Sequence, residues 1–374
     1  MRIAIFCHSL LSDWNHGNAH FLRGIVAELL HRGHEVAAYE PRSGWSRTNL
    51  MRDGGTEAAD DIRATFGWMD DVVRTYERDT LDLEDALDGC DLVIVHEWSE
   101  PALVARIGAL RAAGGTFGLL FHDTHHRAAS APKEMARFDL RHYDGVLAFG
   151  EVIRSIYLDR GWIQRAWTWH EAADTRVFKP LSAAAEDVHD LVWIGNWGDG
   201  ERGAELREFL LRPARRLRLS GAIHGVRYPL RARWAIARAG LRYRGWLPNH
   251  RAPQVFARHR VTVHVPRRPY VAALPGIPTI RPFEALACGI PLVSAPWEDS
   301  EGLFRAGLDF LVARDGDEMR AHLREILHDP RCAEALRACG LQTIEARHTC
   351  AHRVDELLAI CRTIGVDTGV EAAA

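Results

Sequence analysis

The sequence has almost no lysine. Of its 47 lysine and arginine residues, two are lysines, Lys133 and Lys179. No Gly-Lys-Ser/Thr follows the Gly-rich segment at 195–202, so this segment is not a P-loop. The first apolar run, at 3–7, is not followed by Gly-x-Gly-x-x-Gly. A dinucleotide fingerprint is therefore poorly supported at that position, which disfavours a nicotinamide-dependent oxidoreductase.

Cysteine pairs and long apolar runs are also missing. The seven cysteines include no Cys-x-x-Cys pair, and their scatter is typical of reduced thiols in a cytosolic protein. The apolar run at 1–6 is too short for a signal peptide. No stretch approaches the ~18 consecutive apolar residues that a membrane-spanning helix needs. We therefore expect a cytoplasmic protein without a transmembrane segment.

The overall charge and the histidines exclude two further classes of ligand. The formal net charge is −3, which argues against binding of nucleic acid in bulk by electrostatics, so we expect no nucleic-acid partner. The His-x-x-His spacing of His122 and His125 is compatible with a metal site, but no compact set of Cys or carboxylate ligands completes such a site. We therefore predict no bound metal.

The length and the pattern of apolar residues predict an α/β protein. A chain of 374 residues is long for one α/β domain, so two domains are expected. Apolar runs alternate with amphipathic helical segments, which predicts a doubly wound parallel sheet in the first half. Its expected strands lie at 3–7, 34–39, 91–96, 116–121 and 145–149, with helices at 21–30, 101–112 and 151–159. The polar segment 41–80 predicts an excursion from the sheet with a helix at 58–78.

The second half repeats this alternation from the strand at 191–196 to about residue 312. Three helical stretches then close the chain, at 315–328, 331–346 and 350–362. We expect an N-terminal Rossmann-like domain at 1–175, a linker at 176–188, a C-terminal Rossmann-like domain at 189–347, and a C-terminal helix and tail at 348–374.

The most informative stretch runs from Thr279 to Ser294. Pro282 is tolerated in the first turn of a helix, and Gly289 suits its left-handed C-cap, before a strand covered on both faces. Arg281 and Glu284 then lie near the N-terminus of this helix. Free N–H groups and Arg281 suit a diphosphate, while Glu284 can accept both hydroxyls of a ribose diol.

Residues 283–293, Phe-Glu-Ala-Leu-Ala-Cys-Gly-Ile-Pro-Leu-Val, resemble the nucleotide-sugar site of GT-B glycosyltransferases. The resemblance is strongest to the CgeB-like group of the group 1 (family 4-like) enzymes, with its R-x-F-E-A-L-A-C-G signature, and it extends to 301–304 and 347–353. It covers most of residues 190–360 well and residues 1–175 loosely. One position departs from the pattern. Many retaining relatives carry a second glutamate eight positions before Glu284, where this chain has Gly276.

The resemblance implies two Rossmann-like doubly wound domains that face each other across a cleft, with a C-terminal helix returning to the first domain. It implies transfer of a sugar from a nucleoside diphosphate sugar to an acceptor hydroxyl, without a metal or another cofactor and with retention of configuration. Glu284 is expected on the ribose, and Arg281, Arg202 and Arg267 on the phosphates. The residues expected to contact the donor are Glu284, Arg281, Thr279, Ile280, Phe283, Gly195, Asn196, Trp197, Arg202, Trp246, Arg267 and Tyr270.

Polar clusters in the first half follow predicted strands, where open α/β sheets bind ligands. The residues expected to contact the acceptor are Asn15, His16, Gly17, His20, Glu97, Trp98 and His125. Each cluster also has a plain structural interpretation. The loop at 12–20 is equally an N-cap loop with incidental polar residues, and a pair such as Glu97 with Trp98 is more often a helix-terminal carboxylate beside a core Trp.

His122 and Asp123 are the expected catalytic residues. In retaining GT-B relatives a His or His-Asp at this strand end touches the transferred sugar near the reacting carbon. The resemblance therefore implies that this pair orients the sugar or stabilises charge on it. An inverting enzyme would instead need Asp123, His125 or His16 as a general base. The alternatives are a nucleotide-sugar epimerase or hydrolase of the same fold, and a non-catalytic GT-B scaffold that binds a partner protein.

Overall fold

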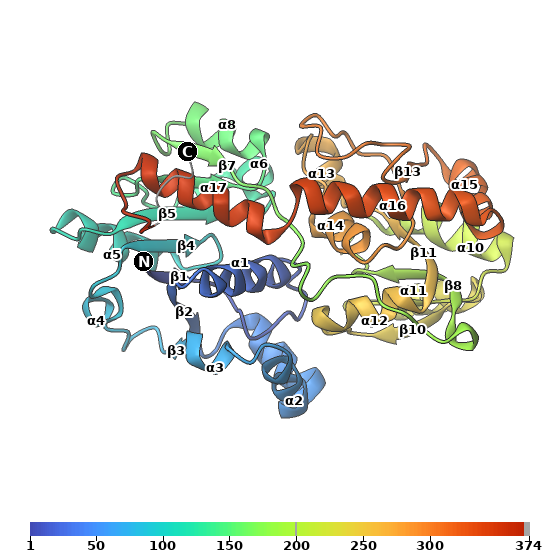
Figure 1. The fold of residues 1–374 in the computed structure, drawn as a ribbon, viewed down its shortest axis with the longest axis horizontal. Coiled ribbons are helices and arrows are strands. Elements are labelled where there is room, and N and C mark those ends of the chain that lie inside the picture. Colours follow the sequence, from blue (N-terminus) through green and yellow to red (C-terminus); the bar gives the residue numbers. More distant parts are fainter. Residues whose placement is uncertain (199, 370–374) are drawn as a thin grey trace. The chain divides into compact units, whose positions relative to one another are not determined.

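The structure is a computed structural model that describes residues 1–198 and 200–369 (Figure 1). It contains two compact units, one of Met1–Glu171 with the chain from Cys350 onward, and one of Ala172–Thr349. The chain therefore leaves unit 1 once and returns to it with its last helix. The domain boundaries inferred from the sequence stay predictions, and residues 370–374 of the predicted tail lie outside the described residues.

Unit 1 is built on a seven-stranded parallel sheet in the order β3-β2-β1-β4-β5-β6-β7. Its strands are β1 (Arg2–Phe6), β2 (Glu35–Pro41), β3 (Val73–Tyr76), β4 (Leu92–His96), β5 (Gly118–Asp123), β6 (Gly145–Ala148) and β7 (Ala166–Thr168). Its helices are α1 (Ala19–His31), α2 (Trp45–Thr65), α3 (Met69–Val72), α4 (Leu83–Leu87), α5 (Pro101–Ala112), α6 (Arg127–Ser130), α7 (Pro132–Met135), α8 (Glu151–Asp159) and α17 (Cys350–Thr363). Every residue of β4 and β5 is buried, as expected for central strands covered on both faces.

The last helix of the chain, α17, packs against α1 within unit 1. The Arg32 guanidinium donates to the Ala351 carbonyl at 3.1 Å and pairs with Asp355 at 2.6 Å. The Trp169 indole Nε1 donates to the Arg353 carbonyl at 2.8 Å. The returning C-terminal helix that the resemblance implied is thereby confirmed.

The predicted helix at 58–78 is wrong at both ends. The helix α2 begins earlier, at Trp45, and is interrupted at Gly55, which has φ +63°. Residues 73–76 form β3 and pair in parallel with β2, so the segment is not an excursion from the sheet. The reason is the pairing with β2, because Val73, Thr75 and Tyr76 are β-branched or aromatic residues that favour a strand once a neighbouring edge is available.

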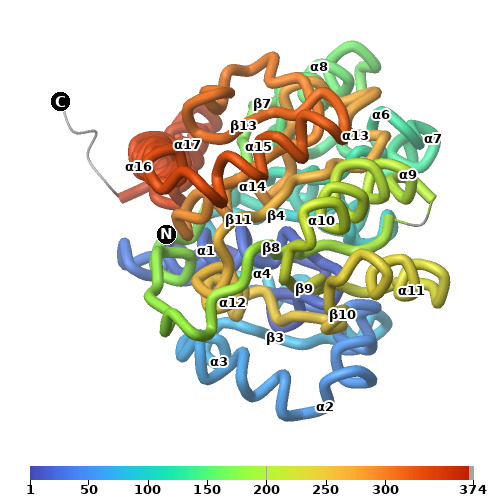
Figure 2. The backbone as a smooth tube through the Cα atoms, turned by 90° about the vertical axis from the view of Figure 1, so that its right-hand side faces the viewer, coloured from blue at the N-terminus to red at the C-terminus, as the bar shows by residue number. Residues whose placement is uncertain are grey.

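Unit 2 is built on a six-stranded parallel sheet in the order β10-β9-β8-β11-β12-β13. Its strands are β8 (His189–Ile194), β9 (Gly221–His224), β10 (Arg242–Gly245), β11 (His259–His264), β12 (Leu292–Ser294) and β13 (Leu311–Val312). Its helices are α9 (Gly203–Leu206), a π-helical turn (Arg207–Leu211), α10 (Arg212–Leu217), α11 (Leu230–Arg238), α12 (Ala252–Ala257), α13 (Arg268–Ala273), α14 (Ile280–Ala287), α15 (Gly316–His328) and α16 (Pro330–Arg347), with 3₁₀ turns at Ala185–Asp187 and Asn249–Arg251. In Figure 2 the labelled strands run from β10 through β9, β8 and β11 towards β13. Two doubly wound parallel sheets confirm the fold class expected from the sequence.

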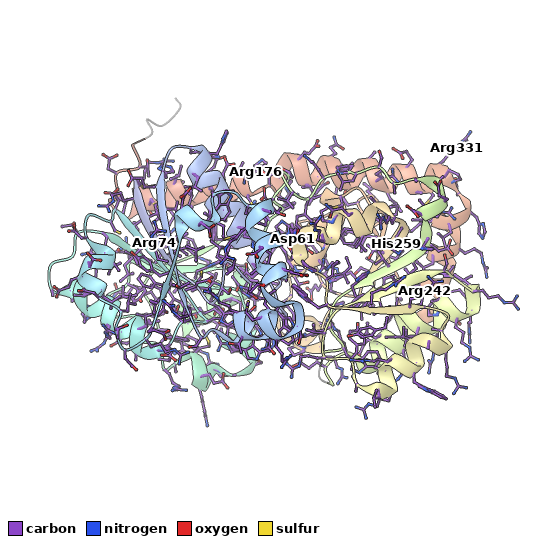
Figure 3. The ribbon with its side chains drawn as sticks, turned by 90° about the horizontal axis from the view of Figure 1, so that it is seen from below. Asp61, Arg74, Arg176, Arg242, His259 and Arg331 are labelled. Atoms are coloured by element: carbon purple, nitrogen blue, oxygen red, sulfur yellow. The ribbon has the colours of Figure 1, made fainter. Side chains whose placement is uncertain are left out.

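In each sheet, one of the two edge strands carries exposed arginines (Figure 3). Arg74 is exposed on β3, and Arg242 and Arg244 are exposed on β10, where they alternate with half-buried residues. Charged side chains on an edge strand discourage pairing with a further strand, because a charge would be buried.

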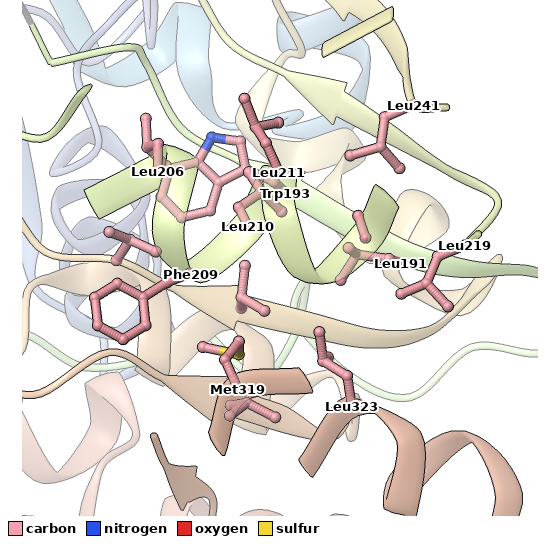
Figure 4. Close-up of a cluster of buried hydrophobic side chains, with 14 of the residues drawn as sticks. Leu191, Trp193, Leu206, Phe209, Leu210, Leu211, Leu219, Leu241, Met319 and Leu323 are labelled. Carbon is pink, nitrogen blue, oxygen red and sulfur yellow. The ribbon is translucent and has the colours of Figure 1, made fainter. Parts of the chain in front are cut away.

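The core of unit 2 contains apolar side chains from segments far apart in the sequence (Figure 4). Leu191 and Trp193 come from β8, Phe209 from the turn before α10, and Met319 and Leu323 from α15. The helices α10 and α15 lie side by side over this cluster. This packing fixes the carboxyl end of β8, from which the Gly-rich segment leaves.

The carboxyl ends of β8 and β9 approach each other closely through two glycines. A Cβ atom on Gly225 would lie 2.0 Å from the carbonyl oxygen of Gly195, and Gly225 has φ +146°. No side chain fits at that distance, so glycine is required by the contact of the two backbones. In the part of the chain that the structure describes, none of the helices combines the length and the hydropathy of a membrane-spanning segment.

We expect Gly225→Ala to lower the free energy of unfolding more than Gly307→Ala does. Gly307 also has a left-handed φ, of +87°, but no atom lies within 4 Å of the position that a Cβ would take, so it isolates the cost of backbone strain at ~1–2 kcal/mol. The clash at Gly225 should add a further ~1–3 kcal/mol. Urea denaturation of both variants measures the difference. Equal losses would contradict the close approach of the two strand ends.

Candidate functional site

The helix α14 carries a buried carboxylate near its first turn. Glu284 is fully buried, and its Oε1 accepts a hydrogen bond from Asn249 Nδ2 at 2.7 Å. Its Oε2 is paired with the guanidinium of Arg281, one turn earlier on the helix. A buried carboxylate needs such partners, because losing them would leave an uncompensated charge in a low dielectric. The side chain of Arg281 is 16 % exposed, so the ion pair is not completely shielded from solvent.

Backbone geometry at the start of α14 is unusual. Thr279 precedes the helix with φ +66° and ψ 171°, a left-handed conformation that a β-branched residue adopts at a cost of ~1–3 kcal/mol. Its side chain makes no capping hydrogen bond to the helix. Gly289 follows the helix with φ +65°, which confirms the left-handed glycine expected at its end.

A second arginine, Arg202, interacts with the charges of Arg281 and Arg267. Its guanidinium donates to the backbone and side-chain oxygens of Asn196 at 2.9 and 2.8 Å and to the Val265 carbonyl at 3.0 Å. Desolvation by the surrounding protein lowers the pKa of Arg202 to about 10, and the positive charges of Arg267 and Arg281 add to this shift. Three arginine charges therefore lie close enough to interact, and Glu284 and Glu201 balance two of them. The cluster keeps an excess of positive charge, which favours an anion placed among the arginines.

Arg202 and Asn196 order the predicted donor loop, and Arg267 is nearer to solvent. The side chain of Arg267 is 25 % exposed and pairs with Glu201 at 3.3 Å. Because both terminal nitrogens of Arg202 donate to backbone or side-chain oxygens of the protein, its contribution to an anion is mainly its charge. Arg267 and Arg281 are the arginines of this cluster whose guanidinium groups reach the surface.

His264 was not among the predicted site residues, although it ends β11 beside this cluster. Its Nδ1 lies 2.9 Å from the hydroxyl of Ser294, which ends the neighbouring strand β12. Burial lowers the pKa of His264 to about 3, and Arg202 and Arg281 contribute to this shift. The imidazole is thus neutral at physiological pH. The signal in the sequence was its position near the end of an apolar strand, shortly before an Arg-rich loop.

Several predicted donor residues have side chains that pack in the core. Phe283 lies 5.2 Å from the ring of Phe304, and Trp197 lies 5.7 Å from that of Tyr228. Ile280 is also buried. The remaining members are Gly195 directly after β8, Trp246 after β10, and Tyr270 on α13. Trp246 is half-buried, and its Nε1 has no hydrogen-bond partner among the described residues. Donor contact by these residues stays a prediction.

A Gly-x-Gly-x-x-Gly spacing in unit 2 was not singled out in the sequence. It runs from Gly198 to Gly203, after β8 and at the start of α9, and Gly198 and Gly200 both have left-handed φ values of +84° and +93°. In dinucleotide-binding proteins an acidic residue at the end of the next strand binds the ribose. Here β9 ends at His224, so the acid that such a site needs is missing from that strand.

In unit 1 the predicted catalytic residues close the strand β5. The strand runs through Asp123, so His122 and Asp123 belong to it and do not follow it, which corrects the predicted strand end at Phe121. His122 pairs in register with His96 of β4, and their rings lie 5.1 Å apart. The ring of Trp169 lies 4.9 Å from that of His122. His122 Nε2 is buried and has no hydrogen-bond partner among the described residues.

Two buried carboxylates lie at the ends of β4 and β5. Asp123 accepts hydrogen bonds from the Tyr157 hydroxyl at 2.8 Å and from the His125 backbone N–H at 3.0 Å. Glu97 is paired with Arg127, which also donates to the Glu97 carbonyl at 2.8 Å. Burial raises the pKa of both carboxyls, and Arg127 partly opposes the shift of each. Such raised values suit groups that hold or move a proton near neutral pH.

Glu97 is connected to the histidines through one hydroxyl. The Thr124 Oγ1 lies 3.1 Å from His96 Nε2 and 3.5 Å from Glu97 Oε1. Trp98, next in sequence, is 42 % exposed, with the Arg127 guanidinium 4.2 Å from its ring centroid. The plain interpretation of Trp98 as a core residue is therefore wrong, because its ring lies at the surface.

The predicted acceptor loop before α1 is held from two directions. Glu40, at the end of β2, accepts from the backbone N–H groups of Leu10 and Leu11 at 2.7 and 3.1 Å. Arg23, on α1, donates to the Leu10 carbonyl at 2.8 Å and pairs with Asp13 at 2.9 Å. Both side chains are buried. They fix the backbone of a loop that belongs to neither a strand nor a helix.

The predicted acceptor residues of this loop differ in exposure. Gly17 is exposed and Asn15 is half-buried with φ +50°, whereas His16 and His20 are buried. The ring of His16 lies 6.3 Å from that of His96, so the loop contacts the strand-end cluster. The structure thus brings together His16, Glu97, His122, Asp123 and His125 in unit 1, while acceptor contact stays a prediction.

Several residues of these two sites were missed in the sequence. They are Asn249, Ser294, Thr124, Arg127, Tyr157 and Trp169. Thr124 and Arg127 were within reach of sequence reasoning, because they closely follow the strand that ends in His122 and Asp123. Tyr157 and Trp169 come from distant segments and needed the fold. Among the described residues, no group of three or more His, Cys, Asp or Glu side chains is placed to hold a metal ion.

We expect the His122→Gln variant to lose less stability than the parent when the pH is lowered. Burial lowers the pKa of His122 from 6.5 to about 3, so between these values the unfolded chain binds a proton that the folded chain does not. The free energy of unfolding of the parent therefore falls as the pH decreases through this window, by up to ~1.4 kcal/mol per pH unit from this residue. Urea denaturation at pH 6.5 and 5.5 measures the slope, with exposed His328→Gln as the control. Parallel slopes in the parent and in His122→Gln would contradict the burial of a neutral imidazole.

Comparison with known proteins agrees with this fold. Residues 205–359 match the family described as glycosyl transferase-like. No curated protein matches the sequence significantly.

Solved structures match both units. An α-glucosyltransferase solved with UDP-glucose and DNA containing an abasic site has a TM-score of 0.70 and 12 % identity, over 97 % of this chain and 99 % of that one. Sucrose-phosphate synthase from Thermosynechococcus elongatus has a TM-score of 0.65 and 14 % identity, over 97 % and 99 %. HepE of Anabaena, solved with UDP and glucose, has a TM-score of 0.63 and 13 % identity, over 97 % and 100 %.

These structures share the GT-B fold, and at such identities the likeness concerns the fold alone. The resemblance to GT-B glycosyltransferases found in the sequence is thereby confirmed, while the narrower CgeB-like assignment stays a prediction. The chain therefore has the fold of the GT-B glycosyltransferases, and its residues 205–359 are similar to the glycosyl transferase-like family.

Proposed function

We propose that the chain transfers a sugar from a nucleoside diphosphate sugar to an acceptor hydroxyl, with retention of configuration and without a bound metal. The observation that carries the proposal is the buried Glu284, held by Arg281 and Asn249 beside a cluster of arginines. The similarity to an α-glucosyltransferase and to HepE, both solved with UDP-glucose, supports this type of donor. The seven free cysteines support a cytoplasmic location.

Donor binding requires an exchange of partners at Glu284. The carboxylate is fully buried, and both of its oxygens have protein partners, so a ribose reaches it only when Arg281 or Asn249 moves. Arg281 is the better candidate, because the donor brings a diphosphate for its guanidinium and two ribose hydroxyls for the carboxylate. The number of charge-assisted hydrogen bonds is then preserved, and neither charge is left buried alone.

The same residues account for catalysis in unit 2. When the bond from the anomeric carbon to the diphosphate breaks, the electron pair leaves with the phosphate oxygen, and negative charge grows there. Arg281, Arg267 and the N-terminus of α14 stabilise this charge, and Arg202 adds its positive field. In this scheme the guanidinium groups take the role that a divalent cation has elsewhere. The acceptor oxygen forms the new bond, and its proton leaves with the departing phosphate.

The residues of unit 1 act on the sugar and the acceptor. His122 is neutral and has a buried nitrogen without a hydrogen-bond partner among the described residues, so it suits a hydrogen bond to a sugar hydroxyl. Asp123 is held by Tyr157 and by the backbone of His125, which fixes the carboxylate beside it. Arg127, itself paired with Glu97, supports the exposed ring of Trp98, a surface on which a sugar can stack.

We expect Glu284→Gln to lose the preference for a ribose over a deoxyribose. The experiment uses calorimetry with UDP, GDP and ADP, followed by the 2′-deoxy form of whichever nucleotide binds. In the parent the missing hydroxyl should cost ~1.5–3 kcal/mol, roughly a tenfold or greater loss of affinity, because it removes a hydrogen bond to a charged group. In Glu284→Gln the two nucleotides should bind within about threefold of each other.

Glu205→Gln is the matched control, because Glu205 also pairs with an arginine, Arg268 at 2.8 Å, but near the surface. It should keep the preference of the parent. A Glu284→Gln variant that still prefers the ribose form would disprove contact between this carboxylate and the ribose. No heat with any nucleotide would favour a non-catalytic scaffold.

Turnover should persist in excess EDTA, since the arginines replace the metal in stabilising the leaving diphosphate. Release of the nucleoside diphosphate, followed with and without EDTA, checks this expectation. Proton NMR of the product should show the anomeric configuration of the donor. A strict requirement for a divalent cation would contradict the role given to Arg281 and Arg267, and conversion of the donor without any acceptor would identify an epimerase or hydrolase.

A further inference from the structure

One segment of unit 2 is strongly basic. Residues 209–260 include 13 arginines and not one aspartate, glutamate or lysine. The formal net charge of the whole chain is −3, so this segment contributes +13 and the rest of the chain −16. Net charge alone therefore hides a marked separation of charge. All 13 arginines are exposed.

The basic segment forms one side of the unit 2 sheet. It contains the outer strand β10, its neighbour β9, and the helices α10, α11 and α12. The helix α11 lies against β10, and Figure 2 shows the two next to each other. Figure 3 labels Arg242 on β10 within this part of the molecule. The guanidinium groups are thus distributed around this edge of the unit 2 sheet, and we call the exposed face of these elements the basic surface.

The basic surface carries two large apolar side chains in the open. Leu230 is 81 % exposed and Trp234 is 69 % exposed, more than any other large hydrophobic residue among those described. They are four residues apart on α11 and therefore on the same face of the helix, opposite the buried Ala232 and Ile236. A leucine and a tryptophan that project together from a soluble domain indicate a contact surface.

Arginines flank this apolar pair on the same helix. Arg231 and Arg238 lie on the same face as Leu230 and Trp234, and the Arg238 guanidinium lies 5.3 Å from the Trp234 ring. The ion pairs of the segment reach acids outside it, as Arg216 does with Asp317 at 3.0 Å. The face of α11 therefore combines cationic and apolar groups without an acidic neighbour in its own segment.

We propose that this face of α11, with the surrounding basic surface, docks on an anionic membrane surface. Leucine and tryptophan side chains enter the boundary between headgroups and acyl chains, where indole rings are favoured. The arginines contact the negative headgroups, and their attraction adds to the burial of the apolar pair. Duplex nucleic acid would use the charge but would leave Leu230 exposed to water, so it fits the surface less well. This inference goes beyond the sugar transfer and does not depend on it.

The test is co-sedimentation of the full chain with vesicles of phosphatidylcholine, with and without phosphatidylglycerol. We expect binding to the anionic vesicles, at least roughly tenfold weaker binding to the neutral ones, and loss of binding as salt is raised. Leu230→Ser with Trp234→Ser should weaken binding about tenfold or more, and so should Arg231→Glu with Arg238→Glu. Circular dichroism and calorimetry with the nucleotide confirm that each variant is folded.

Matched controls lie elsewhere in unit 2. Leu308 is 52 % exposed, and Arg331 is exposed on α16, so Leu308→Ser and Arg331→Glu make the same chemical changes outside the basic surface. Both should bind vesicles as the parent does. The proposal is overturned if the parent ignores anionic vesicles, or if the α11 variants bind as the controls do. It is also overturned if duplex DNA binds more tightly than vesicles and Leu230→Ser with Trp234→Ser leaves vesicle binding unchanged.

Discussion

The buried ion pair between Glu284 and Arg281 is the interaction on which the proposed donor site of unit 2 depends. A carboxylate with no exposure to solvent is stable only while its oxygens have strong donors, and here Arg281 and Asn249 supply them. The hydrogen bond from Asn249 to Glu284 links α14 to the turn before α12. The ion pair also holds Arg281 within reach of the charge of Arg202, whose guanidinium is fixed by the loop after β8. One pair of charges thereby connects three of the loops at the carboxyl ends of the unit 2 strands.

The polar residues of unit 1 follow a different principle. There the carboxylates Glu97 and Asp123 are buried with pKa values raised by burial, and the pKa of His122 beside them is lowered by the same cause, which keeps the imidazole neutral. The unit 2 cluster is rich in positive charge, whereas the unit 1 cluster combines a neutral imidazole with two buried carboxyls, one of them paired with Arg127. This contrast matches a division of labour in which one unit stabilises the charge of a leaving group and the other contacts uncharged hydroxyls.

Much of the fold was predictable because its strands are apolar runs ending in polar residues, as at β4 and β5. The helix at 58–78 was not, because β3 is stabilised by pairing with β2, a contact that local propensity does not contain. At the sites, the placement of Arg281 and Glu284 followed from their spacing on one helix. Their mutual pairing did not, and neither did the contact with Asn249, because a hydrogen bond between residues 35 positions apart depends on how α14 packs. Trp98 was open between two interpretations, and the fold was needed to place its ring at the surface.

The measurement that tests the central claim most directly is a crystal structure of the chain with a bound nucleoside diphosphate. We predict that the Arg281 guanidinium will have left Glu284 and will lie on the diphosphate, with both ribose hydroxyls within hydrogen-bond distance of the freed carboxylate. A bound nucleotide with the pair of Arg281 and Glu284 intact, and with its ribose in contact with other residues, would contradict this exchange of partners.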